Sequence, residues 1–200
     1  MADQTTVEYR EFRKQRIVEA TERALEHISF EDLTVTIICD EANISRPTFY
    51  RYFQDKFEIA QWLWNQAGEK YLRECGRSLG WYESNLLMMR NFLEHQVFFS
   101  AANASDIDFN ACINHGYRKR VEYLEEVIRE RSPLLLTDDV RFQITFFTDA
   151  ESRAIAAWGE RGMKTPPEVV ARRIEQCVPP RLHSIIEDAH RQASPLTRPQ

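Results

Sequence analysis

The segment LTVTIICDEANISRPTFYRYFQDK, from Leu33 to Lys56, decides the fold of this chain. Its spacing predicts two short helices joined by a tight turn. Thr34 can cap the first helix, whose apolar residues fall at helical intervals. Asn43 stands at the turn, and asparagine tolerates the left-handed backbone conformation better than any residue except glycine. Ser45 can then cap a second helix, which has Pro47 in its first turn.

The second of these helices carries side chains that suit contact with DNA. Arginine, threonine and tyrosine side chains bind phosphates and base edges. Within seven positions the chain supplies Arg46, Thr48, Tyr50, Arg51 and Tyr52. Phe49 and Phe53 are four residues apart and can face inward. The segment therefore predicts a helix-turn-helix unit with a recognition helix.

This unit resembles the DNA-binding domain of TetR-like transcriptional regulators. The family pattern is roughly T-x-x-x-I-A-x-x-A-G-V-S-x-x-T-x-Y-x-Y-F-x-x-K, which this chain matches at Thr34, Ile38, Ala42, Ile44, Ser45, Thr48, Tyr50, Tyr52, Phe53 and Lys56. Cys39 replaces a small alanine, and Asn43 replaces a glycine at a position that either residue can fill. The closing Tyr-x-Tyr-Phe-x-x-Lys makes the resemblance specific.

The resemblance implies a set of DNA contacts. Arg46 and Thr48 are the expected base-reading residues, and the forked donors of arginine favour guanine. Tyr50 is expected to contact a base or a phosphate, and Arg51 could serve either purpose. Thr34, Tyr52 and Lys56 are expected to contact phosphates. The full predicted DNA-binding set is Thr34, Thr36, Ser45, Arg46, Pro47, Thr48, Tyr50, Arg51, Tyr52 and Lys56.

Composition places the chain among all-helical globular proteins. It has 200 residues, 43% of them hydrophobic and 12% aromatic, with only six glycines and eight prolines. No apolar run approaches the roughly 18 residues that span a bilayer, and the N-terminus is polar, so we expect a cytoplasmic protein without a membrane contact. The four cysteines lack paired spacing, which indicates free thiols in a reducing compartment.

The net charge of −5 is compatible with DNA binding but does not support it. DNA meets a local face of the protein, not its total charge. Between residues 45 and 57, Arg46, Arg51 and Lys56 stand against the single acid Asp55.

The pattern divides the chain into two domains and a tail. Residues 1–54 are predicted to form a three-helix DNA-binding domain, residues 55–193 a helical effector-binding and dimerisation domain, and residues 194–200 a flexible tail, with about nine helices in all. The first helix, from about Val7 to Ile28, carries a basic face that either is solvated or contacts phosphates beside the major groove. Its residues are Arg10, Arg13, Lys14 and Arg16.

Helical periodicity continues through the second domain. The predicted helices are one capped by Asp55 and running to about Cys75, a buried one from Trp81 to Ala102, a short one capped by Ser105 and Asp108, one from Tyr117 to Arg131, a long one from Thr137 to Gly159, and a last one after the capping box Thr165–Glu168. In the last helix Pro179 and Pro180 predict a kink or a short restart, because one apolar stripe continues across them.

The last two long helices each have two apolar faces, which is more than a monomer needs. We therefore expect a homodimer through a four-helix interface, as in TetR-like proteins. Two recognition helices would then enter successive major grooves about 34 Å apart on a near-palindromic double-stranded DNA operator.

The middle helices are expected to enclose a pocket for a small, largely apolar effector. Residue by residue, packing in the core is the better interpretation, because Met and aromatic stripes at helical spacing are mostly core. The candidate lining residues are Trp81, Met88, Met89, Phe92, Phe99, Phe109, Tyr117 and Phe146.

The sequence offers no convincing catalytic or metal site. Cys112 and His115 share a helical face, but two ligands do not make a metal site. No phosphate-binding glycine loop, Ser-His-Asp arrangement or carboxylate pair appears, so we expect neither an enzyme nor a cofactor. The predicted function is a homodimeric transcriptional regulator, a repressor that leaves its operator when the effector binds. The alternative is a TetR-like co-activator that acts through protein–protein contacts without binding DNA.

Overall fold

The computed structural model describes residues 4–104 and 109–193, and within them the chain is helical, with no strand. The predicted all-α class is confirmed. The helices are α1 (Gln4–Leu25), α2 (Val35–Ala42), α3 (Arg46–Tyr50), α4 (Lys56–Ala67), the π-helical turn η1 (Gly68–Leu72), α5 (Trp81–Glu94), α6 (Gln96–Ala104), α7 (Phe109–Arg131), the 3-10 turn η2 (Pro133–Leu135), α8 (Asp138–Glu160), α9 (Pro167–Gln176) and α10 (Pro180–Ala193).

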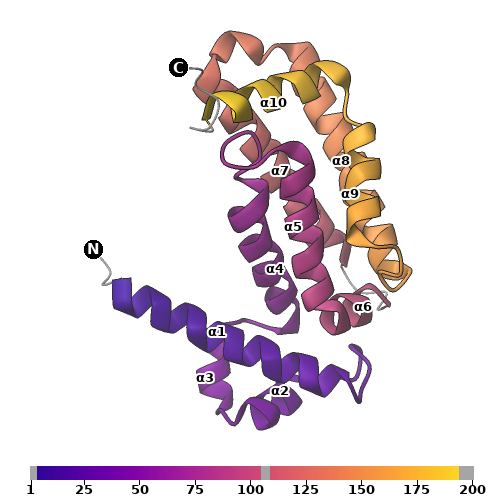
Figure 1. Ribbon diagram of the computed structural model, residues 1–200. Coiled ribbons are helices and arrows are strands. Elements are labelled where there is room, and N and C mark those ends of the chain that lie inside the picture. The colour runs from indigo at the N-terminus through magenta and orange to yellow at the C-terminus, as the bar shows by residue number, and fades with distance from the viewer. Residues whose placement is uncertain (1–3, 105–108, 194–200) are drawn as a thin grey trace.

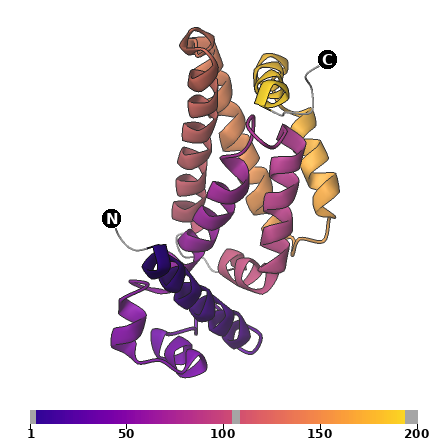
Figure 2. The same cartoon turned by 60° about the vertical axis from the view of Figure 1, so that its left-hand side comes forward.

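The helices form two bodies joined through α4 (Figure 1). We call α1, α2 and α3 the head; α1 lies across one end of the molecule, with α2 and α3 on its outer side. We call the helices from α5 to α10 the body, in which α7 and α8 run antiparallel beside each other (Figure 2). The helix α10 crosses the end of the body farthest from the head.

Contacts of the head with α4 and with the body hold it in place. The Trp62 indole donates to Glu11 on α1 at 3.1 Å, and His95 and Glu22 are hydrogen-bonded at 2.9 Å. The Phe30 ring meets the Phe98 ring of α6 edge to face, with centroids 5.8 Å apart. The head is thus in contact with α4, with the residue that ends α5 and with α6.

Two helices of the first half differ from their predicted limits. The helix α1 ends at Leu25, before Ile28, and Phe12 is 60% exposed although the sequence pattern placed it on the inner face. The face that is buried consists of Ile17, Val18, Ala20, Thr21, Ala24 and Leu25. The helix α4 ends at Ala67, and the chain continues through η1 before Cys75, where one regular helix was expected.

The buried helix expected from Trp81 to Ala102 is two helices. The chain breaks at His95, so that α5 and α6 point in different directions (Figure 1). The reverse error occurs in α7, which is continuous from Phe109 to Arg131 where two helices were expected. The predicted caps Ser105 and Asp108 lie outside the described residues.

The last predicted helix is also two helices. The first of them, α9, begins at Pro167, and the residue at its N-cap position is Pro166, not Thr165. No side chain caps the helix, so the capping box predicted at Thr165 is wrong. The helix α9 ends at Gln176, and α10 restarts at Pro180 in a new direction (Figure 1). Two successive prolines remove two backbone donors, whereas proline is well tolerated in the first turn of a helix. The predicted restart is present, but the two segments do not share one axis.

No helix in the described ranges is both long enough and apolar enough to cross a membrane.

Candidate nucleic-acid interface

The helix-turn-helix is built by local capping bonds. The Thr34 hydroxyl accepts from the Ile37 amide at 3.3 Å and begins α2. Asn43 follows the last residue of α2 at φ 51° and ψ 52°, the left-handed conformation expected of it. The Ser45 hydroxyl accepts from the Thr48 amide at 3.3 Å and begins α3. These caps confirm the two predicted helices and their turn.

One face of α3 is buried and anchors the helix to the head. Phe49 is completely buried and Phe53, just after the helix, is 1% exposed. Their rings lie 6.1 Å apart, and Phe53 meets Trp62 of α4 edge to face. Lys14 of α1 lies over the rings of both Phe53 and Trp62, so this basic residue of α1 packs onto the head.

The opposite face of α3 presents the predicted DNA-binding side chains to solvent. Arg46, Pro47, Tyr50 and Arg51 are exposed. The Arg46 guanidinium donates to the Tyr50 hydroxyl at 3.3 Å, and this bond raises the pKa of Arg46. The guanidinium therefore keeps its charge and is held along the helix by a tyrosine that is itself 49% exposed.

The other predicted contacts surround this face. Ser45 and Thr48 share a hydroxyl–hydroxyl bond of 2.9 Å, so the Thr48 side chain is oriented by the cap. Thr34 and Thr36 are exposed on and beside α2. Tyr52 is half-buried, with the Arg51 guanidinium over its ring. On α1, Arg10 and Arg16 are exposed, while Arg13 is half-buried.

Lys56 has a different role from the phosphate contact expected of its side chain. Its ammonium nitrogen donates to the backbone carbonyls of Phe30, Glu31 and Leu33, at 2.6, 3.2 and 2.8 Å. It also lies over the rings of Phe30 and Phe57, and its burial lowers the pKa of the ammonium group. The side chain therefore links α4 to the loop between α1 and α2, and is not the free cation that a phosphate contact needs.

The predicted effector-pocket residues are largely core. Trp81, Met88 and Met89 are completely buried, and Phe92 and Phe99 are 2% exposed. Phe92 packs on Trp64 and on Phe99 with ring centroids 4.7 and 4.6 Å apart. Tyr117 is half-buried, and the side chains of Phe109, Cys112 and His115 lie outside the described residues. These aromatic and Met stripes fill the body, as stripes at helical spacing usually do.

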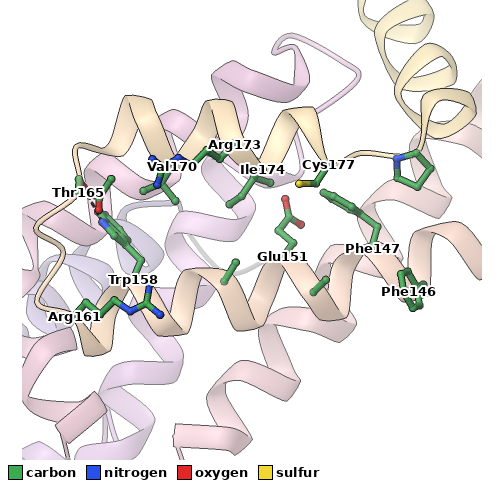
Figure 3. Close-up of a pocket in the computed structure, with 13 residues that line it drawn as sticks. Phe146, Phe147, Glu151, Trp158, Arg161, Thr165, Val170, Arg173, Ile174 and Cys177 are labelled. Carbon is green, nitrogen blue, oxygen red and sulfur yellow. Dashed lines mark hydrogen bonds between the residues drawn. The ribbon is translucent and has the colours of Figure 1, made fainter.

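An apolar groove lies elsewhere, between α8 and α9, and of the predicted lining residues whose side chains are described only Phe146 borders it (Figure 3). Its volume is about 480 Å3. Below it, the body holds a buried ion pair that the sequence analysis missed, Arg120 with Glu151 at 3.2 Å. The available signal was a charged residue, Glu151, in register with the buried Ile144, Phe147 and Ile155.

Among the side chains that the structure describes, which exclude those of Cys112 and His115, no three of the metal-ligating types are close enough to hold a metal ion.

Comparisons with known proteins agree with this fold. The model of the family "Bacterial regulatory proteins, tetR family" matches residues 17–61, which include the helix-turn-helix. The transcriptional activator DhaS of the dhaKLM operon of Lactococcus lactis subsp. lactis (strain IL1403) is 27% identical over 93 residues, 46% of this chain. The matched region spans 50% of that relative's length.

Two solved structures share the architecture. The dihydroxyacetone kinase operon activator DhaS superposes with a TM-score of 0.64 at 20% identity, over 88% of this chain and 97% of that one. A tetR-family transcriptional regulator from Streptomyces coelicolor superposes with a TM-score of 0.50 at 15% identity, over 94% and 92%. The head of this chain therefore matches the DNA-binding domain of tetR-family regulators in sequence, and the chain as a whole shares its fold with two proteins of that kind.

Proposed function

We propose that this protein is a homodimer that binds a near-palindromic operator and is released from it by a small molecule. The observation that carries the proposal is the exposed face of α3, with Arg46, Pro47 and Tyr50. The opposite side of the helix is anchored by the buried rings of Phe49 and Phe53. A buried aromatic face fixes the helix, so the exposed side chains meet DNA in a defined orientation. Such preorganisation favours a sequence-specific contact over a purely electrostatic one.

In this proposal Arg46 and Thr48 read bases, and Tyr50 contacts a base or a phosphate. Thr34, Thr36 and Tyr52 lie at the edge of the DNA major groove and contact phosphates. Arg51 contacts either a base or a phosphate. Lys56 acts through its own backbone amide at the first position of α4, because its ammonium group is bonded to carbonyls and the next two amides are bonded to Asp55.

The dimer is proposed to form through α8 and the helices after it. Phe142 and Phe146 are 70% and 68% exposed on α8, with their rings stacked 6.1 Å apart. Exposed aromatic pairs of this kind are uncommon on a surface that stays in water. Two copies related by a twofold axis would cover this face and present their recognition helices about 34 Å apart.

The effector domain is proposed to comprise residues 55–193 and to act by linkage. A ligand that favours a dimer with wrongly spaced recognition helices must weaken operator binding by the same factor by which the operator weakens ligand binding. Release by ligand corresponds to repression. Activation is the second candidate direction, because the similar DhaS protein is named a transcriptional activator.

The first experiment is binding of the purified protein to the DNA upstream of its own gene, titrated at several salt concentrations. We expect tight binding that survives excess random competitor and that weakens steeply with salt, because each phosphate contact releases a counterion. Absence of binding to any duplex at low salt would contradict the proposal and favour the co-activator that works through protein contacts alone.

The second experiment separates base reading from charge. Arg46→Ala should narrow the gap between operator affinity and random-DNA affinity by about 1–3 kcal/mol, the usual value of one base contact. Arg129→Ala removes the same charge from an exposed site on α7 and serves as the control. Equal weakening of operator and random DNA by Arg46→Ala would assign Arg46 to the backbone.

The third experiment tests the dimer. The double substitution Phe142→Ser with Phe146→Ser should give a folded monomer in sedimentation velocity, since both side chains are exposed within one copy. Tyr9→Ser with Phe12→Ser, on the exposed side of α1, is the matched control. A dimer that survives the first pair would place the interface elsewhere.

A further inference from the structure

The groove between α8 and α9 has the form of a small-molecule site. Its volume of about 480 Å3 lies within the range of ligand pockets in proteins. Apolar side chains from both helices line it: Phe146, Phe147, Trp158, Val170 and Ile174. At one end the Trp158 indole is held in place by donating to the Thr165 carbonyl at 2.8 Å.

A buried carboxylate interrupts the apolar part of this lining. Glu151 is 4% exposed, and its carboxylate points from α8 toward α9, below Ile174 and Cys177 (Figure 3). Its Oε2 accepts from Arg120 Nε, but among the described residues its Oε1 has no hydrogen-bond partner. A buried acceptor without a donor is costly, and it selects for a ligand that brings one.

The charges around the groove define which donor fits. The Arg120 guanidinium already balances the charge of Glu151. Burial opposes the charge of Arg120, but its pKa is raised because the Glu151 carboxylate lies beside it. Arg161 and Arg173 add two further positive charges to the groove lining. A cationic donor such as an amine would meet three guanidinium groups against one carboxylate. A neutral hydroxyl group donates to Glu151 without that repulsion.

We propose that the α8–α9 groove binds a neutral, largely apolar molecule whose hydroxyl group donates to Glu151 Oε1. This inference rests on the proposed function, for which it identifies the effector site and the chemical class of the effector. The site lies outside the cluster of Met and aromatic residues that the sequence pattern favoured.

The groove is connected to the DNA-binding head by a short path of contacts. The ligand-binding residue Glu151 holds Arg120, which donates to the Leu72 carbonyl of η1 at 3.2 Å. The turn η1 continues directly from α4, and α4 is bonded to the head through Lys56 and Trp62. The same groove is bordered by Phe146 of the proposed dimer face. A bound molecule would therefore act both on the contacts that lead to the head and on the dimer interface.

The test is calorimetric titration of the DNA-free protein with three probes that share one ring system: 2-naphthol, 2-methoxynaphthalene and 2-naphthylmethylammonium. A hydrogen bond to a charged acceptor predicts that 2-naphthol binds about tenfold to a hundredfold more tightly than the methoxy compound, which lacks the donor. The ammonium compound should bind more weakly than 2-naphthol. Equal binding of the naphthol and its methyl ether, or no binding of any probe because a second copy fills the groove, would overturn the proposal.

The variant that tests Glu151 must keep the body folded. Glu151→Leu combined with Arg120→Met removes both charges and retains the packing volume, which buried ion pairs tolerate. We expect this variant to bind 2-naphthol and 2-methoxynaphthalene equally, while Ala154→Trp, which fills the groove and leaves the ion pair in place, binds neither. An unchanged preference for 2-naphthol in the Leu–Met variant would show that the hydroxyl group does not meet Glu151.

These measurements use no DNA, so they succeed or fail independently of the proposed regulator. If the protein binds no operator but prefers 2-naphthol through Glu151, the groove remains a hydroxyl-selective site and only its link to DNA is lost. If it binds an operator and shows no such preference, the effector site lies elsewhere.

Discussion

The polar contacts that stabilise the head and those that stabilise the body differ in the number of residues between their partners. In the head, Thr34 and Ser45 each bond to an amide three residues away. In the body, Arg120 bonds to Glu151, 31 residues along the chain, and to a carbonyl 48 residues away. Contacts of the first kind are visible in the spacing of a sequence, and contacts of the second kind are not. This comparison predicts that replacing a polar residue lowers the free energy of unfolding most where its partner is buried and distant in the sequence.

The largest effect is expected in the body, for Arg120→Met. Arg120 is 2% exposed, and its loss leaves the Glu151 carboxylate buried without its cation. Breaking a buried pair in this way costs about 3–5 kcal/mol. We expect urea unfolding to show this loss in the free energy of unfolding, with a lower midpoint.

The double variant Arg120→Met with Glu151→Leu is the control for that experiment. Because desolvation of both charges is avoided, its stability should return to near that of the natural protein or exceed it. A double variant as unstable as Arg120→Met would mean that shape, not charge, explains the loss, and the contrast between body and head would weaken.

The next effect concerns Lys56, through which the head also depends on partners distant in the sequence. Lys56→Met keeps the aliphatic stem but removes bonds to three carbonyls, two of them with nitrogen–oxygen distances below 3 Å. Hydrogen bonds to a charged group contribute about 1.5–3 kcal/mol, so we expect a loss near 2 kcal/mol in urea unfolding. If stability is unchanged while operator binding weakens and its salt dependence flattens, the ammonium group contacts phosphate after all.

The same difference in range explains what could be predicted from sequence. The caps, the left-handed Asn43 and the inward Phe49 and Phe53 follow from neighbours within four residues, and the structure has all of them. The Lys56 ammonium bonds to carbonyls 23 to 26 residues away, so the motif predicted the residue but not its partners.

In the body, apolar periodicity predicted helices but not where they break or what lies between them. The break at His95 leaves no mark in the apolar run, since Val97 to Phe99 continue it. Met88 and Met89 carried the same pattern that a pocket wall would have, but neighbouring helices bury them completely. Whether an apolar stripe faces a cavity or a neighbour depends on the packing of the other helices, which no local pattern contains.

A smaller effect is expected where α4 and α7 meet closely. A Cβ atom at Gly116 would lie 2.9 Å from the Trp64 ring, so Gly116→Ala must displace a ring buried between the helices. Overpacking of this kind costs about 1–3 kcal/mol. At Gly68 the nearest atoms of Tyr123 are 3.8 Å away, and Gly68→Ala should be neutral or slightly stabilising when both variants are compared by urea unfolding. Equal effects of the two substitutions would show that α7 can shift to make room.

The smallest effect is expected for a single helix cap, and here head and body can be compared directly. Ser45 caps α3 and Thr137 caps α8, each accepting from the amide three residues on, at 3.3 and 3.4 Å. Ser45→Ala and Thr137→Ala should each cost about 1 kcal/mol in urea unfolding, the usual value of a cap.

Their effects on operator binding should nevertheless differ. The helix α3 has five residues, and the Ser45 hydroxyl also orients Thr48, a predicted base contact. The helix α8 has 23 residues and keeps its packing without the cap. Ser45→Ala should therefore weaken operator binding more than random binding, while Thr137→Ala should change neither in fluorescence anisotropy. If both variants lose affinity in proportion to their loss of stability, the cap supports the fold of the head without orienting the base-reading surface, and the specificity must come from Arg46 and Tyr50.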